Sequence, residues 1–173
     1  RHRIQFFIYK GLSLIEHYYR DPGLRAIIDV DLVAHQKDIP AVSEIIHGHG
    51  FIARYEPGLH FDREDLCLDI HQDLFRLDRV PSRALALSDR MDTVWNRLVP
   101  CSFQGSQIAR LDPIDEFIIL GWHALKHSFS HLKWLVDLKL MYQNLSGCPD
   151  FHRRLRTLPD DSIRTGVWYA LRL

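Results

Sequence analysis

Two aspartates separated by a single residue give the sequence its clearest chemical signal. Asp29 and Asp31 fall in residues 24–34, a segment that alternates as a half-buried strand does. Strand residues two apart project to the same side, so the two carboxylates would converge. Their charges repel, and burying both is costly unless a cation lies between them. Carboxylate oxygens suit Mg²⁺ or Mn²⁺, so the pair predicts a divalent-metal site. A solvent-facing acidic pair on a one-sided sheet would give the same pattern.

A third carboxylate, Asp69, strengthens the prediction of a metal site. Residues 64–71 alternate again, with Leu66, Leu68 and Ile70 on one face and Cys67, Asp69 and His71 on the other. If this strand lies antiparallel to residues 24–34, three carboxylates meet. Such a cluster can hold two metal ions that clamp the attacking and leaving oxygens of an in-line displacement.

The elements that must position these residues are expected in the first half of the chain. Strands are predicted at residues 4–9, 24–34, 51–61 (bent at Pro57-Gly58) and 64–71, and helices at residues 12–19 and 38–47. Asp21-Pro22-Gly23 predicts a type II turn, which requires a positive φ at Gly23. We expect an α+β fold whose small mixed or antiparallel sheet, with flanking helices, occupies residues 1–80.

The second half, residues 81–173, predicts a mainly helical region that completes the cleft. Helices are expected at residues 82–96, 112–127, 131–145, 151–158 and 161–173, with a short strand pair around Gly105. Asp112 is the expected N-cap of the second of these helices, with Pro113 in its first turn. Arg1 is not an initiator Met, and residues 162–173 end while still apolar, so we expect a longer natural protein.

The amino-acid composition limits the kinds of molecule that the protein can bind. Lys plus Arg and Asp plus Glu both number 22, so no overall field attracts a nucleic-acid duplex, and phosphate binding must be local. The three scattered cysteines argue against a disulfide framework and favour a reducing cytoplasm. No apolar run approaches the roughly 18 residues of a membrane span.

The order of the motifs resembles the DNA polymerase β-like nucleotidyltransferase superfamily. More narrowly, it resembles an uncharacterised bacterial nucleotidyltransferase family with a Lys-Gly element, an Arg-x-x-x-Asp-x-Asp strand, an Asp-x-His strand, and a later helix pair rich in His, Lys, Trp and Asp. The matching segments here are residues 10–11, 25–31, 69–71, 123–127 and 132–137. The resemblance implies transfer of a nucleotide from an NTP, such as ATP, to an unidentified acceptor, with Mg²⁺ or Mn²⁺ as cofactor.

The resemblance also implies site residues. Asp29, Asp31 and Asp69 become the catalytic and metal-binding carboxylates. The implied nucleotide-binding residues are Lys10, Gly11, Ser13, Arg25, His71, His127, Lys133 and Asp137. Gly11 would let the backbone approach the triphosphate. Where the superfamily has Gly-Ser or Gly-Gly, this chain has Gly11-Leu12-Ser13, so Ser13 supplies the hydroxyl one residue late or the phosphate grip is weakened.

Two other interpretations of the sequence remain open. The chain could be a nucleotide-binding or regulatory module that kept the fold and lost catalysis, a reading that the altered turn after Gly11 supports. His123, His127 and His131 recur at every fourth position and would share a face of an unbroken helix, as a zinc hydrolase would need. Histidines that pack between helices, or that contact the nucleotide, would give the same spacing. Trp122 and Trp134 are expected in the core rather than as stacking platforms.

Overall fold

A mixed seven-stranded sheet forms the centre of the computed structural model, which describes residues 4–55, 59–74, 91–158 and 161–172. The strand order is β3-β4-β5-β2-β1-β7-β6. The strands are β1 (Phe6–Tyr9), β2 (Val30–Ala34), β3 (Ile52–Ala53), β4 (His60–Arg63), β5 (Leu66–His71), β6 (Val99–Phe103) and β7 (Ser106–Arg110). The sheet is mixed because β1 with β7 and β2 with β5 are parallel pairs, while the remaining neighbours are antiparallel.

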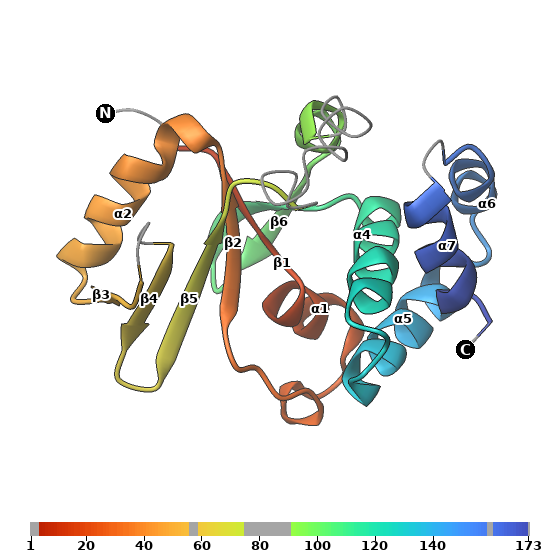
Figure 1. The fold of residues 1–173 in the computed structure, drawn as a ribbon, viewed down its shortest axis with the longest axis horizontal. Coiled ribbons are helices and arrows are strands. Elements are labelled where there is room, and N and C mark those ends of the chain that lie inside the picture. The colour runs from red at the N-terminus through yellow and green to blue at the C-terminus, as the bar shows by residue number, and fades with distance from the viewer. Residues whose placement is uncertain (1–3, 56–58, 75–90, 159–160, 173) are drawn as a thin grey trace.

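Helices pack on both faces of the sheet. They are α1 (Gly11–Tyr18), α2 (Ile39–Gly48), α4 (Pro113–Lys126), α5 (Leu132–Leu145), α6 (Pro149–Arg156) and α7 (Asp161–Ala170), with 3-10 turns η1 (Pro22–Leu24) and η2 (Gln36–Asp38). Figure 1 shows α2 beside β3 to β5 at one end and α4 to α7 at the other. Residues 91–96 are also helical, and the rest of the helix expected at 82–96 lies outside the described residues. Among the described residues, no helix is long and apolar enough to cross a membrane.

The two faces of the sheet carry two separate cores. Phe7 and Val33 face the larger core, where α1, α4 and the later helices pack, whereas Leu32 and Ile70 face the smaller core under α2. Alternation along β2 therefore places Asp31 on the same face as Val33, toward the helices. This difference between the faces decides where the polar residues of β2 and β5 can gather.

Several sequence predictions are confirmed. The strand pair around Gly105 forms as β6 and β7, and Gly105 itself has φ 77°, a value that glycine adopts without a steric penalty. Asp112 caps α4 by accepting hydrogen bonds from the backbone N–H groups of Ile114 and Asp115.

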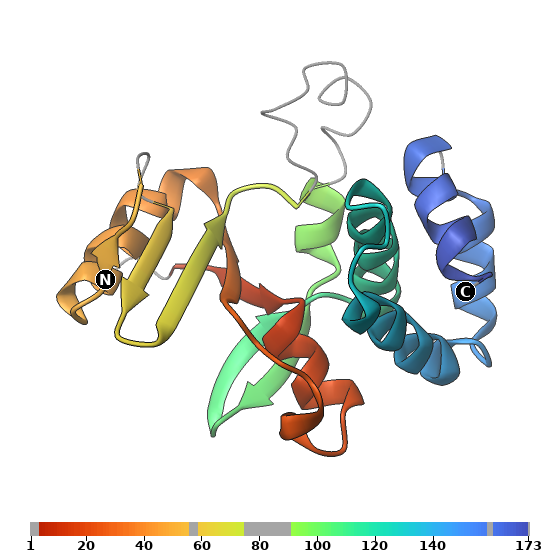
Figure 2. The same ribbon diagram turned by 60° about the horizontal axis from the view of Figure 1, so that its bottom comes forward.

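The sheet is larger than expected. Because β7 pairs with β1, the sheet extends past the boundary expected near residue 80 (Figure 2).

The turn at Asp21-Pro22-Gly23 was predicted wrongly. Gly23 is not among the positive-φ residues of the described chain, and Pro22–Leu24 forms the 3-10 turn η1 instead of a type II turn. The Asp21 carboxylate accepts a hydrogen bond from the Gly23 N–H and so stabilises this tighter conformation.

The strand predicted for residues 24–34 is shorter, and its pairing differs. It begins at Val30, because the ladder with β1 ends at the Tyr9–Asp31 pair, where the chain turns at Lys10 into α1. The pairing of β2 with β5 is parallel, so the predicted antiparallel arrangement is wrong. The residues between these strands contain α2, β3 and β4, which supply the crossover that a parallel pair needs.

Candidate active site

Asp31 and Asp69 lie side by side on neighbouring strands. They are direct partners in the register of β2 and β5, and His71 follows Asp69 on the same face. One ligand atom from each of these three residues lies within 4.8 Å of the other two. Among the described residues, no other group of three His, Cys, Asp or Glu side chains has this geometry. Two carboxylates and an imidazole at this spacing fit a single divalent cation.

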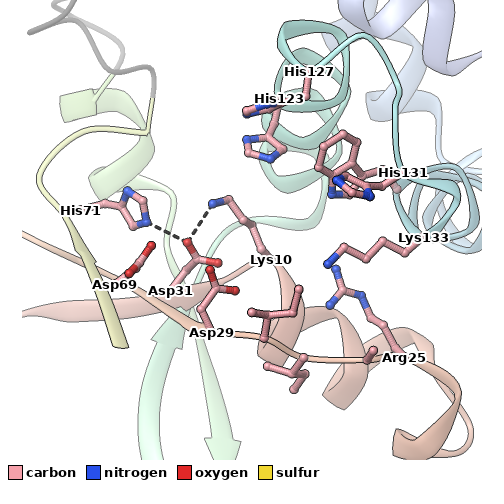
Figure 3. A pocket seen from close by; sticks show the side chains of 15 residues that line it. Lys10, Arg25, Asp29, Asp31, Asp69, His71, His123, His127, His131 and Lys133 are labelled. Atoms are coloured by element: carbon pink, nitrogen blue, oxygen red, sulfur yellow. Dashed lines mark hydrogen bonds and ion pairs between the residues drawn. The ribbon is translucent and has the colours of Figure 1, made fainter. Parts of the chain in front are cut away.

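Asp29 lies directly before β2, beside this group rather than within it. Its side chain is half-buried and points toward Asp31 in Figure 3. Burial raises the pKa of Asp29, and repulsion from Asp31 and Asp69 raises it further. The three carboxylates therefore share an excess of negative charge, which a bound cation would relieve.

Asp31 is the most heavily contacted of the three carboxylates. It is only 4% exposed, and its Oδ1 accepts hydrogen bonds from Lys10 Nζ and His71 Nε2, each at 2.7 Å. Burial alone would raise the pKa of Asp31, but the hydrogen bond from His71 and the charge of Lys10 outweigh burial and lower it. Asp31 is therefore ionised at neutral pH.

Asp69 has its own histidine partner, which the sequence did not reveal. His60 on β4 donates from Nδ1 to Asp69 Oδ1 at 2.5 Å, because β4 and β5 pair with His60 opposite Asp69. The His60 side chain is 39% exposed, so it holds Asp69 from the solvent side. Each strand carboxylate thus has one imidazole that fixes its orientation.

The opposite wall of the site comes from α4 and α5. A cavity of about 300 Å³ separates this wall from the carboxylates. Lys133 points into the cavity in Figure 3, and its charge acts on Asp29. Burial, together with the charge of Lys10, lowers the pKa of His123 to about 3, so His123 is neutral at pH 7. The cavity therefore has an acidic side on the sheet and a polar, partly cationic side on the helices.

The three histidines surround Trp134 and do not share one helix face. The helix breaks because Ser128 and Phe129 adopt positive φ, which leaves His127 at the end of α4 and His131 before α5. The ring centroids of His123, His127 and His131 lie 5.3, 5.4 and 4.7 Å from that of Trp134. They do not form a metal-binding group in the described part of the chain. Trp134 lies at the edge of the core and lines the cavity, while Trp122 is buried as predicted.

The turn after β1 differs in detail from the phosphate loop that the resemblance implied. A Cβ at Gly11 would lie 2.9 Å from Arg25 Nη1, so Gly11 makes room for a guanidinium. Ser13 is fully buried on the far side of α1, near Glu116, and does not line the cavity. The hydroxyl of Ser13 is therefore not part of the site.

Asp137 is also outside the cavity. It is 1% exposed and accepts two hydrogen bonds from Arg25, from Nε and Nη2, each at 2.8 Å. The hydroxyl of Tyr19 donates to the same carboxylate at 2.6 Å. Asp137 therefore fastens the segment before β2 to α5, and Arg25 reaches the cavity edge with its remaining nitrogen toward Gly11.

Most of the residues that the sequence suggested gather at one cavity. Those lining it are Lys10, Gly11, Arg25, Asp29, Asp31, Asp69, His71, His127 and Lys133. Ile27, Ile28 and Trp134 also line the cavity and were not expected to. The exposure of Ile27 and Ile28 follows from the late start of β2, which leaves residues 26–29 without strand partners.

Comparisons with known proteins bear on the fold and the family of the chain. The chain resembles the solution structure of the antibiotic-resistance factor ANT(2'')-Ia, with a TM-score of 0.56 and 12% identity over 98% of this chain and 82% of that one. It also resembles the crystal structure of an antigenic nucleotidyltransferase-like protein from Paracoccidioides brasiliensis, with a TM-score of 0.60 and 15% identity over 98% and 80% of the two chains. At these identities the likeness shows the fold. No curated protein sequence matches the chain. A family model described as uncharacterised nucleotidyltransferase matches residues 1–173, so the chain belongs to that family of transferase enzymes.

Proposed function

We propose that this nucleotidyltransferase is metal-dependent and moves an NMP from an NTP to a nucleophile on a small molecule, peptide or protein. The observation that carries the proposal is the register of the parallel pair β2 and β5, which sets Asp31 beside Asp69 on the helix-facing side of the sheet. Asp29 adds a third negative charge at the same place. A sheet face that otherwise packs hydrocarbon has no structural need for three carboxylates.

Asp31 and Asp69, with Asp29 next to them, would hold Mg²⁺ or Mn²⁺. The donors fit because carboxylate oxygens dominate the group and because Asp31 is ionised. Bound there, the ion would neutralise triphosphate charge and polarise the α-phosphoryl group. His60 and His71 keep the two strand carboxylates in fixed orientations.

The helix wall and the lysines would receive the triphosphate. Lys10 and Lys133 bring two ammonium groups to the cavity, and Arg25 reaches its edge. Neutral His123 offers a hydrogen-bonding ring rather than a charge. The chain has no net charge, so these local cations must supply the attraction for phosphate.

In the proposed reaction, the acceptor oxygen forms a bond to the α-phosphorus as the bond from that phosphorus to the bridging oxygen breaks. Pyrophosphate leaves with that oxygen, and the acceptor's proton passes to solvent or to Asp69. Asp69 suits this task because the side-chain partner of its carboxylate, His60, is itself open to solvent. Positioning and charge neutralisation supply the rate enhancement.

Pyrophosphate release from each NTP with Mg²⁺ or Mn²⁺, in the presence of candidate acceptors, tests the proposal. Asp31→Asn and Asp69→Asn should lower the rate at least about a hundredfold, because one metal-binding charge is lost. Asp62→Asn on β4 is a matched control, since Asp62 lies on the same sheet, pairs with Arg54 and does not line the cavity. Full activity in Asp31→Asn, with the fold retained by circular dichroism, would contradict the assignment.

A module that binds nucleotide without catalysis is the second candidate, and the turn after β1 favours it. Ser13 faces the interior, and the space above Gly11 holds the Arg25 guanidinium, so the first turn of α1 grips phosphate less closely than a Gly-Ser turn would. Calorimetry with ATP, GTP, CTP and UTP separates the two functions. Binding with no slow release of pyrophosphate would favour the module.

A further inference from the structure

Lys10 occupies an unusual position for a lysine. Its backbone has φ 54° and ψ −131°, a conformation that favours glycine and is strained for any other residue. The strain persists at the residue that joins β1 to α1, where the side chain is directed across the cavity (Figure 3). A lysine kept where glycine would be more stable indicates that its ammonium is used.

The Lys10 ammonium stands at the place where a metal ion would bind. Nζ lies 2.7 Å from Oδ1 of Asp31, and the carboxylate of Asp31 is one of the three groups that could hold a metal ion with Asp69 and His71. A divalent ion bound to this carboxylate therefore competes with the Lys10 ammonium for its negative charge. The side chain is 19% exposed, makes one hydrogen bond, to Asp31, and has its ammonium 4.7 Å from the centroid of the Tyr9 ring.

Lys10 also faces the opposite wall of the cavity. Figure 3 shows its ammonium between Asp31 on the sheet and His123 on α4, and its charge contributes to the lowered pKa of His123. An anion that binds in the cavity would therefore lie near this ammonium. A triphosphate is such an anion.

We propose that Lys10 is an exchangeable counterion: it neutralises Asp31 in the empty site, leaves when a divalent ion binds, and then binds a phosphate oxygen of the NTP. The proposal rests on the proposed function and names Lys10 as the residue that couples metal binding to nucleotide binding. Two consequences of opposite sign follow. Lys10 weakens metal binding when no nucleotide is present, and it strengthens nucleotide binding once the metal is present.

Mn²⁺ titration of the whole chain, followed by electron paramagnetic resonance, measures the first consequence. Lys10→Met should bind Mn²⁺ about tenfold more tightly than the unmodified protein, because a charged hydrogen bond no longer has to be broken. At saturating Mn²⁺, the same variant should bind a non-hydrolysable ATP analogue about tenfold more weakly by calorimetry. Because coupling is reciprocal, the nucleotide should enhance Mn²⁺ binding less in the variant.

Two control variants separate direct competition for Asp31 from a general electrostatic effect of positive charge on Mn²⁺ binding. Lys133→Met removes a charge from the same cavity without breaking a contact to Asp31, so it should raise Mn²⁺ affinity much less. Lys37→Met removes an exposed charge on η2 and should change neither affinity. If Lys10→Met folds poorly, Lys10→Gly removes the ammonium and relieves the strained φ as well.

The outcomes distinguish this inference from the proposed function. Unchanged or weaker Mn²⁺ binding in both Lys10 variants would overturn the exchange, even where Asp31→Asn loses Mn²⁺ binding. If Asp31→Asn leaves the Mn²⁺ affinity unaltered, the proposed metal site is wrong, and the proposed exchange is wrong with it.

Discussion

Two ion pairs of the same chemical type, Arg25–Asp137 and Lys10–Asp31, do different work in this fold. Asp137 has a planar partner that donates twice, both side chains are 5% exposed or less, and the pair joins α5 to the segment before β2. Asp31 has a lysine that donates once and that lies at a cavity. A bidentate guanidinium fixes geometry, whereas a single ammonium on a flexible stem can leave. The two carboxylates are similarly buried, so their burial alone would not have separated a structural pair from an exchangeable one.

Removing the guanidinium from the structural pair should have the largest effect on stability. Arg25→Met leaves the Asp137 carboxylate buried with only Tyr19 as a partner, which should lower the free energy of unfolding by about 3–5 kcal/mol. Lys10→Met is the matched change in the other pair, and it should cost about 1 kcal/mol because His71 still donates to Asp31. Urea denaturation measures both. Equal losses in the two variants would remove the distinction between the pairs.

Unlike Asp31 and Asp137, a third buried carboxyl group, that of Glu116, has no ion-pair partner among the described residues. Glu116 is fully buried on α4, and neither of its carboxylate oxygens has a hydrogen-bond partner among the described residues. Burial raises the pKa of Glu116 to about 7, although the nearby Ser13 hydroxyl and Arg110 guanidinium lower it in part. At moderately acidic pH the Glu116 side chain is therefore protonated in the folded protein.

Glu116 should make stability depend on pH in a defined direction. Its folded pKa lies above the ordinary 4.5, so its contribution is fully present below pH 4.5 and is lost as pH rises to about 7. At pH 8, Glu116→Gln should be more stable than the unmodified chain by about 3 kcal/mol. Exposed Glu44→Gln is the control and should leave the pH profile unchanged. Parallel profiles for Glu116→Gln and the unmodified chain, in thermal denaturation from pH 4 to pH 8, would contradict this account.

The local pattern of residues was informative about which face each side chain takes. Alternation placed Asp31 on one face and Leu32 on the other, and it did the same for Asp69 and Ile70. It carried no information on which strands are neighbours or on their direction, so the parallel pairing of β2 and β5 could not be read from it. Pairing depends on the whole path of the chain through α2, β3 and β4.

Long-range partners were the part that the sequence concealed. An acidic residue on a helix can face a cleft or a buried cation, and only the fold shows that Asp137 meets Arg25. Likewise, nothing in the sequence around His60 marks it as the partner of Asp69, since the contact depends on the register of β4 and β5. The break between the helices predicted at residues 112–127 and 131–145 is confirmed, and Ser128 and Phe129 form it with positive φ, so the condition for a shared histidine face is not met.

In the proposed function, carboxylates from two parallel strands form one metal site. A crystal grown with Mn²⁺ and a non-hydrolysable NTP, with anomalous scattering recorded for Mn²⁺, would locate the ion. We expect an anomalous peak bonded to Asp31 and Asp69, with the ammonium of Lys10 moved from Asp31 to a phosphate oxygen. A peak among His123, His127 and His131, with Lys10 still on Asp31, would contradict this expectation.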